Sequence, residues 1–241
     1  NMRRFYFIVL INLVYTNSID PSYAILDSIV NKLAPRSVKV EMLQINIHPN
    51  KNDRTFKYEY YSDNIENAQY VKYIYPKKVK NNSFLIKNDG KDIWAYFNRT
   101  KRVRKLASHQ TKQGMQNSEF TFQDLGRNDS WFIDYNIVLE ESDDLKLKLM
   151  LKSGIDLDFS KIVINADRET YYPTKISYYK DDFNEKTLFL NDIEKNGDYI
   201  YSKVMIMKNN RTNAETHMII ENMSFNIDIN KNIFNENMMS R

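Results

Sequence analysis

Four pairs of carboxylates are the residues of this sequence best suited to acid–base or metal chemistry. They are Glu140 with Glu141, Asp143 with Asp144, Asp156 with Asp158, and Asp181 with Asp182. Paired carboxylates act as acid and base in glycosidases. Three of the pairs fall where turns are predicted, which favours solvated loop ends. Asp156 and Asp158 would point the same way from a strand, but a calcium or catalytic site there needs a third ligand that the sequence does not supply.

Other catalytic and metal-binding patterns are missing from the sequence. The histidines, at positions 48, 109 and 217, are isolated from one another and have no carboxylate at a ligand spacing. No serine elbow, phosphate-binding glycine loop or dinucleotide fingerprint is present. The lack of cysteine excludes disulfides, thiolate nucleophiles, cysteine-ligated zinc and lipidation at an N-terminal cysteine. We therefore expect neither an enzyme nor a bound cofactor or metal.

The densest basic cluster is the run Lys101, Arg102, Val103, Arg104 and Lys105. Alternation along a strand would place Arg102 and Arg104 on one face. The run fits either a solvated edge strand or a docking surface for an anionic headgroup or an acidic partner. The 35 basic and 31 acidic residues are otherwise scattered along the chain without a basic arm, which argues against a nucleic-acid partner.

The composition predicts that these side chains are carried by long β-strands. Of the 241 residues, 17 are Tyr and 13 are Phe, whereas only five are Gly and five are Pro. Aromatic side chains suit a pleated, half-buried surface, and few turn residues imply long strands. A chain of this length with 42% apolar residues can bury the core of one large domain.

The clearest strand is 145–152, where Leu145, Leu147, Leu149 and Leu151 alternate with lysines, paired with a strand over 129–141. Near the N-terminus, Val38, Val40 and Met42 alternate with charged residues before Leu43, Ile45 and Ile47 take over, a phase slip that predicts a bulge. Helical spacing predicts a helix over 25–33, and Asn-Asp-Gly at 88–90 marks a hairpin. The fold class we expect is mainly β: a single curled antiparallel sheet of about 10–12 strands, an incomplete β-barrel with one or more covering helices.

The N-terminal residues have the pattern of a secretory signal peptide. Met2-Arg3-Arg4 is followed by the apolar stretch 5–14, and Ser22-Tyr23-Ala24 places small residues at a cleavage site. The alternative is a buried N-terminal strand. We therefore predict a signal peptide over 1–24, cleaved near Ala24, and one domain over 25–241 located in the periplasm.

The region from about residue 70 to the C-terminus resembles a known family. Its order is Ile-Trp-Ala-Tyr-Phe at 93–97, Lys-Arg-Val-Arg-Lys-Leu at 101–106 and Met-Gln-Asn-Ser-Glu-Phe-Thr-Phe-Gln-Asp-Leu at 115–125, followed by Asp-Arg-Glu-Thr-Tyr-Tyr-Pro-Thr-Lys-Ile-Ser-Tyr at 167–178. This order resembles the outer-membrane lipoprotein-sorting proteins, relatives of the periplasmic carrier LolA. Asn117 stands where the family has Gly. The motif positions are Lys101, Arg102, Arg104, Phe120, Asp124 and Leu125.

The resemblance implies a LolA-like half-barrel whose apolar interior accepts acyl chains of lipids or lipoproteins in transit to the outer membrane. An inner-membrane transporter or an outer-membrane acceptor would then be a partner. The expected cavity residues are Trp94, Tyr96, Trp131, Ile133, Leu145, Leu147, Leu149 and Leu151, although a closed core explains them as well. Asp124 and the pair Arg102 and Arg104 could tie the 115–125 loop to the sheet. A periplasmic sensor module of the same fold that binds a membrane protein, and a β-sandwich hydrolase using Asp156 or Asp158, are the alternatives.

Overall fold

The computed structural model describes residues 20–31, 35–88, 90–122, 124, 130–140 and 144–240, and every structural statement below concerns these residues. The basic and apolar parts of the predicted signal peptide lie outside them. So does Leu125 of the family motif.

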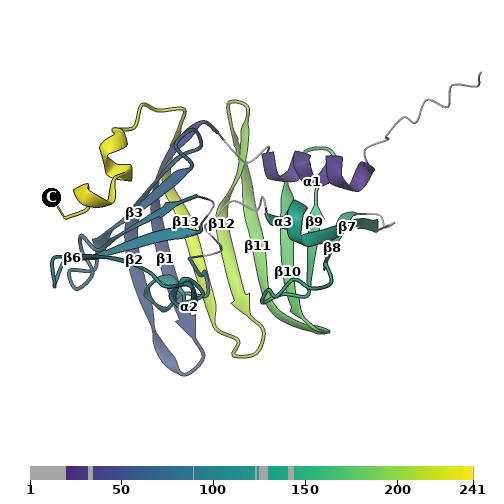
Figure 1. Ribbon diagram of the computed structural model, residues 1–241, viewed down its shortest axis with the longest axis horizontal. Helices are drawn as coiled ribbons and strands as arrows, with labels where there is room; N and C mark the ends of the chain where they lie inside the picture. Colours follow the sequence, from purple (N-terminus) through teal and green to yellow (C-terminus); the bar gives the residue numbers. More distant parts are fainter. Residues whose placement is uncertain are drawn as a thin grey trace, which may run out of the picture.

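One antiparallel sheet of thirteen strands forms the body of the protein (Figure 1). The strands are β1 (Ser37–His48), β2 (Lys51–Asp63), β3 (Ala68–Tyr75), β4 (Ser83–Lys87), β5 (Asp92–Phe97), β6 (Arg102–Lys105), β7 (Tyr135–Glu140), β8 (Leu145–Leu151), β9 (Lys161–Ala166), β10 (Pro173–Lys180), β11 (Phe183–Asn196), β12 (Tyr199–Asn209) and β13 (Glu215–Phe225). Their order is β6-β5-β4-β3-β2-β1-β13-β12-β11-β10-β9-β8-β7. Two meanders therefore join along β1 and β13, and β6 and β7 are the edges of an open sheet. The prediction of one broad antiparallel sheet is confirmed.

Strand β8 shows how the sequence sets the faces of the sheet. Leu145, Leu147 and Leu149 are buried, while Lys146 and Lys148 on the opposite face pair with Glu140 of β7 at 2.8 and 3.1 Å. Period-two alternation produces this split because successive side chains of a strand point to opposite faces. The predicted hairpin is thus confirmed, but its first strand begins at Tyr135, because residues 130–134 are helical.

Short helices and turns complete the chain: α1 (Pro21–Asn31), α2 (Ser108–Thr111), α3 (Ser130–Asp134) and the 3₁₀ turns η1 (Met115–Asn117), η3 (Lys231–Phe234) and η4 (Glu236–Met238). Helix α1 begins four residues earlier than the sequence predicts. Asp20 Oδ1 accepts hydrogen bonds from the backbone N and the Oγ of Ser22 at 2.9 and 2.7 Å, an N-terminal cap. Residues 22–24, predicted to end the signal peptide, therefore form the first turn of a helix.

The two faces of the sheet are covered by different parts of the chain. The larger apolar cluster lies on the face that carries α1, α3 and residues 107–122, which we call the covered face. The smaller cluster lies on the other face, the C-terminal face, where Ile229, Phe234 and Met239 pack against Leu85 and Tyr96. In Figure 1 the C-terminal segment lies beside β3, whereas α1 lies at the opposite end of the sheet. None of the described helices is long and apolar enough to span a membrane.

Candidate functional site

A loop between β6 and α3 covers the middle of the sheet. We call residues 107–122 together with Asp124 the cover loop. Its apolar side chains Met115, Phe120 and Phe122 are between 0 and 6% exposed, and the ring of Phe122 lies 4.7 Å from that of Phe84 in β4. Helices α1 and α3 add Leu26, Ile29 and Trp131 to the same cluster. The covered face is therefore filled by side chains of the segments that cover it.

The cover loop holds its shape through its own backbone. Met115 N donates to Phe120 O at 3.2 Å, and Ser118 Oγ donates to the same oxygen at 2.7 Å. Asn117 has a left-handed φ of 60°, which Asn tolerates better than most residues and which accounts for the Gly that the family has there. A Cβ on Gly114 would lie 1.7 Å from Ser118 O, so only glycine fits at this position.

Two buried amides of β1 hold the tip of the cover loop. Gln44 and Asn46 are 0 and 1% exposed. Gln44 Nε2 donates to Met115 O at 3.4 Å, and Asn46 Nδ2 donates to Gln116 O at 3.1 Å. The hydroxyl of Tyr73 donates to Gln44 Oε1 at 3.1 Å. These bonds compensate for amides that would be costly to bury unpaired.

Sequence reasoning missed this polar patch, although its signal was visible. The change from Val40 and Met42 to Leu43 and Ile45 is not a phase slip of β1, although the predicted bulge is present in the pairing of β1 with β13. The alternation continues: Gln44 and Asn46 follow Met42 on the covered face, and the apolar side chains at 43, 45 and 47 lie half-buried on the other face. The register shift between Glu41 and Met42 affects the pairing with β13, not the alternation of β1.

An ion pair fixes the far end of the cover loop. Lys186 Nζ of β11 lies 2.7 and 2.8 Å from the two carboxylate oxygens of Asp124, and both side chains are only about one-tenth exposed. Thr121 donates to Asp124 through its backbone N and its hydroxyl at 2.7 and 2.8 Å. Lys186 also lies over the ring of Tyr178, 4.9 Å from its centroid. Asp124 therefore ties the cover loop to the sheet as expected, but through Lys186 of β11, whereas Arg102 and Arg104 are exposed on β6.

Glu119 attaches the loop to the strands between these two points. Its backbone N donates to Thr216 Oγ1 of β13 at 2.9 Å, and its Oε2 accepts from Asn209 Nδ2 of β12 at 3.0 Å. The cover loop thus crosses the sheet from β4 to β11 and is held by a small set of polar contacts above an apolar surface.

A hollow of about 580 Å³ opens at the tip of the cover loop. Its walls come from the start of β2, the end of β3 with the following turn, and the loop tip, and its lining residues are Asp53, Arg54, Thr55, Phe56, Tyr75, Pro76, Lys78, Val79, Gln116 and Asn117. We call it the tip hollow. Its volume lies within the usual range of ligand pockets. Phe56, one of its lining residues, also belongs to the apolar cluster of the covered face.

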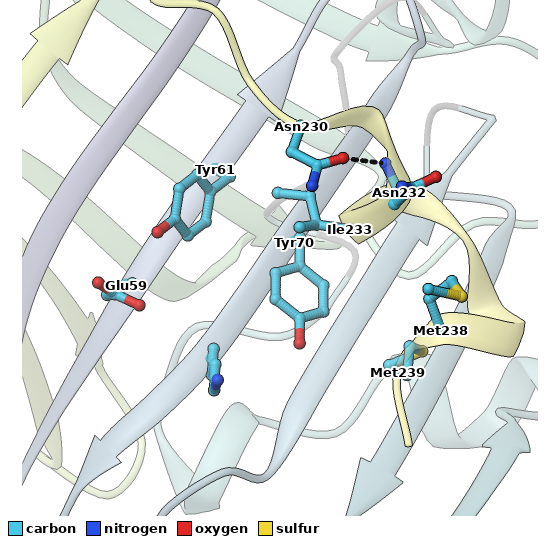
Figure 2. A pocket seen from close by; sticks show the side chains of 9 residues that line it. Glu59, Tyr61, Tyr70, Asn230, Asn232, Ile233, Met238 and Met239 are labelled. Atoms are coloured by element: carbon cyan, nitrogen blue, oxygen red, sulfur yellow. Dashed lines mark hydrogen bonds between the residues drawn. The ribbon is translucent and has the colours of Figure 1, made fainter. Parts of the chain in front are cut away.

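A second hollow, of about 310 Å³, lies on the C-terminal face (Figure 2). Figure 2 shows Tyr61 and Tyr70 of the sheet on one side and Ile233, Met238 and Met239 of the C-terminal segment on the other. The lid of this hollow is the chain terminus rather than the cover loop.

The structure brings only part of the predicted cavity set together. Leu145, Leu147, Leu149 and Trp131 are buried on the covered face, and Leu151 packs against them partly buried. Ile133 is 71% exposed, because α3 replaces the expected strand at this point. Trp94 and Tyr96 belong to the cluster on the C-terminal face. Their neighbours Ile93 and Ala95 occupy the covered face instead, since adjacent residues of a strand alternate.

The basic run forms the edge strand β6, in which Arg102, Arg104 and Lys105 are exposed. Lys105 Nζ lies 2.5 Å from Asp92 Oδ1, and hydrogen bonds from Lys105 and Asn88 lower the pKa of that carboxyl. Lys101 precedes the strand with a left-handed φ of 54°. Phe120, in contrast, is a buried anchor of the cover loop.

The described members of the carboxylate pairs are dispersed over the surface, and Glu141 and Asp143 lie outside the described residues. Hydrogen bonds from Lys146 and Lys148 lower the pKa of Glu140, and Asp158 lies 2.7 Å from Lys112. Asp156 is exposed in the loop after β8. Among the described residues, no three histidine or carboxylate side chains are grouped so that they could hold a metal ion.

The sequence of the chain matches a protein family. Residues 66–241 match the model of a family described as "Uncharacterized protein". The chain belongs to this family. No curated protein sequence matches it.

Solved structures share the fold of this chain over most of its length. One is described as an outer membrane lipoprotein-sorting protein domain from Vibrio parahaemolyticus, with a TM-score of 0.80, 21% identity, and coverage of 92% of this chain and 99% of that one. A DUF1329 family protein from Desulfovibrio piger has a TM-score of 0.79 at 19% identity, covering 92 and 100%. A LolA superfamily protein from Nitrosomonas europaea has a TM-score of 0.70 at 17% identity, covering 88 and 96%. The chain thus shares the fold of these three proteins, which is the LolA-like fold that the motifs predicted.

Proposed function

We propose that this protein carries acyl chains of lipids or lipoproteins against the covered face of its sheet and releases them by moving the cover loop. The observation that carries the proposal is the construction of the cover. A wide apolar surface is closed by α1, α3 and one loop, the cover loop, which a small set of polar contacts holds in place. A surface closed in this way can be opened without unfolding the sheet. The shared fold with a lipoprotein-sorting domain supports the same function.

The energetics suit a carrier. Each methylene removed from water contributes about 0.8 kcal/mol, so a long acyl chain gains roughly 10 kcal/mol on burial. An acyl chain entering the covered face would replace Met115, Phe120 and Phe122 as the apolar partner of the sheet. The exchange would be nearly balanced, which permits both uptake and release. Burial and release need no catalytic residue.

The proposed setting is the periplasm, with export directed by the N-terminal residues. The proposed partners are the acyl chains themselves, an inner-membrane donor and an outer-membrane acceptor. The pattern of residues 2–24 supports export, and the fold shared with a lipoprotein-sorting domain supports this route.

Lipid extraction and ligand titration test the proposal directly. The purified protein is extracted with organic solvent and the extract is analysed by mass spectrometry, while saturable binding is measured with a fluorescent fatty acid. We expect co-purifying lipid and a single class of binding site. A protein without lipid that takes up no fatty acid, but forms a stable complex with a membrane protein's periplasmic segment, would favour a sensor module instead.

A reversible disulfide that holds the cover loop closed distinguishes ligand binding beneath the loop from adsorption to the protein surface. The chain contains no cysteine, so Glu119→Cys with Thr216→Cys introduces one possible disulfide. The two positions are adjacent, because Glu119 N lies 2.9 Å from Thr216 Oγ1. We expect the oxidised variant to lose fatty-acid uptake and the reduced variant to regain it, with the reduced state as the matched control. Equal uptake in both states would contradict entry beneath the loop.

A further inference from the structure

The basic residues of the chain are concentrated in one part of the sheet. Residues 72–112 contain twelve of the 35 lysines and arginines but only two of the 31 aspartates and glutamates. This segment includes β4, β5 and β6 and the turns between them. Positive charge is therefore distributed much less evenly along the chain than the nearly equal totals of basic and acidic residues suggest.

Several of these cations meet at one end of the strands. The turns after β3 and β5 are neighbours, because Asn98 N donates to Asn82 Oδ1 at 2.9 Å. The start of β2 reaches the same end, since Lys57 pairs with Tyr75 at the end of β3. We call the exposed cations there the basic rim: Arg54, Lys77, Lys78, Lys80, Arg99 and Lys101.

The basic rim lacks the counter-charges that neighbouring lysines have. Within the described part of the chain, none of its six cations forms an ion pair, and Lys101 Nζ donates to the neutral amide oxygen of Asn98 at 2.6 Å. By contrast, Lys57 pairs with Glu221 at 2.6 Å and Lys112 with Asp158 at 2.7 Å. Asp53, in the wall of the tip hollow, is the acidic residue nearest in sequence to Arg54. This end of the sheet therefore carries an excess of positive charge at its surface.

Exposed apolar side chains accompany the charges. Ile74 is 39% exposed and Tyr75 is 53% exposed, both at the end of β3 directly before Lys77 and Lys78. Cations mixed with exposed aliphatic and aromatic groups are typical of surfaces that bind the interface of a bilayer, where Tyr is enriched. A purely electrostatic site for an acidic protein would not need the apolar pair.

We propose that the basic rim docks the protein on an anionic phospholipid surface, with the strand ends toward the headgroups. The tip hollow shares Arg54, Tyr75 and Lys78 with this surface, so its mouth would open at the membrane. Basic residues near an anionic bilayer each strengthen binding several-fold, and the attraction decays over a screening length of about 8–10 Å in physiological salt.

Vesicle sedimentation tests the docking surface. The full chain is mixed with vesicles of phosphatidylcholine alone or with one-third phosphatidylglycerol, at low and high NaCl. We expect binding to the anionic vesicles only, lost at high salt. The triple variant Lys77→Gln with Lys78→Gln and Lys80→Gln should bind the anionic vesicles about 100-fold more weakly, because each charge contributes about fivefold to the affinity. The control with equal net charge, Lys180→Gln with Lys195→Gln and Lys203→Gln on β10–β12, should bind like the original chain.

A second variant separates a membrane from an acidic protein. Tyr75→Ser keeps every charge and should still weaken vesicle binding measurably. Unchanged binding by this variant, together with full competition from soluble poly-glutamate, would identify an acidic-protein site and overturn the proposal. Equal loss in the two triple variants would overturn it as well. The double variant Lys77→Gln with Lys80→Gln leaves Lys78 of the tip hollow in place and should weaken vesicle binding without changing fatty-acid uptake, so failure of docking and failure of the carrier function give different results.

Discussion

The ion pair between Asp124 and Lys186 makes the opening of the cover loop measurable. In Asp124→Asn, Lys186 would keep its charge while only 11% exposed, next to a neutral amide. Removing one partner of a largely buried pair costs about 3–5 kcal/mol, and the remaining exposure favours the lower end of that range. Because the contact holds the loop rather than the sheet, we expect about 3 kcal/mol to be lost from the closed state, which corresponds to roughly a 100-fold larger open population.

Hydrogen exchange measures the larger open population, and ligand binding measures its effect on affinity. Amides of residues 114–121 should exchange about 100-fold faster in Asp124→Asn, whereas amides of β12 and β13 should keep their protection. The apparent affinity for a fluorescent fatty acid should rise as the competent fraction rises. The matched control is Glu194→Gln, which breaks the exposed pair with Lys203 at 3.1 Å and should change neither quantity measurably.

Two results would refute this reasoning. If loop exchange accelerates while fatty-acid affinity stays constant, the loop opens but does not gate a binding surface. If Asp124→Asn lowers the protection of the whole sheet equally, the loop is part of one cooperative unit and cannot open separately. Adding Lys186→Met to Asp124→Asn should restore part of the protection, since the unpaired charge is removed.

Three further predictions concern the loop, the N-terminus and the buried tyrosines. Gly114→Ala should accelerate exchange of the cover loop, because its Cβ would collide with Ser118 O, and unchanged exchange would show that the turn adapts. A chain starting at Asp20 should melt at a higher temperature than one starting at Ile25, which lacks the cap and first turn of α1; equal melting temperatures would disprove a role for these residues. Burial raises the pKa of Tyr172 from 10.0 to about 12, so its stabilising contribution is complete below pH 10 and is lost between pH 10 and 12. Denaturant unfolding across that range should show the loss, reduced in Tyr172→Phe.

The strand pattern was predictable because alternation is a local property. Leu145, Leu147 and Leu149 share a buried face in the structure as they do in the sequence pattern. The alternation does not show which segment of the chain covers each face of the sheet. Trp94 and Tyr96 alternate as cleanly as the leucines, yet the C-terminal segment covers them, and contacts at such sequence separation leave no local signal.

The polar anchors of the cover loop were harder to predict for a related reason. Gln44 and Asn46 interrupt the apolar face of β1 because backbone oxygens from more than 60 residues away meet them. From the sequence alone, a polar residue on the apolar face of a strand looks like a change in the phase of the alternation. Buried amides within an otherwise regular strand therefore indicate where another segment docks its backbone.

The position of the tip hollow connects the carrier hypothesis with the docking hypothesis. Gln116 and Asn117 of the cover loop form one of its walls. Lys78 of the basic rim and the neighbouring Tyr75 form another. An anionic headgroup at Lys78 and Arg54 would lie next to the point where the loop tip leaves the sheet. Its acyl chain could then follow the widening gap toward Phe56 without crossing water. The amide contacts of Gln44 and Asn46 would be the first to break, since they hold the tip, and the Asp124 pair at the far end of the loop would break last, before the loop is fully open. Loop opening from the tip thus predicts that exchange at residue 116 precedes exchange at residue 121 when anionic vesicles are added.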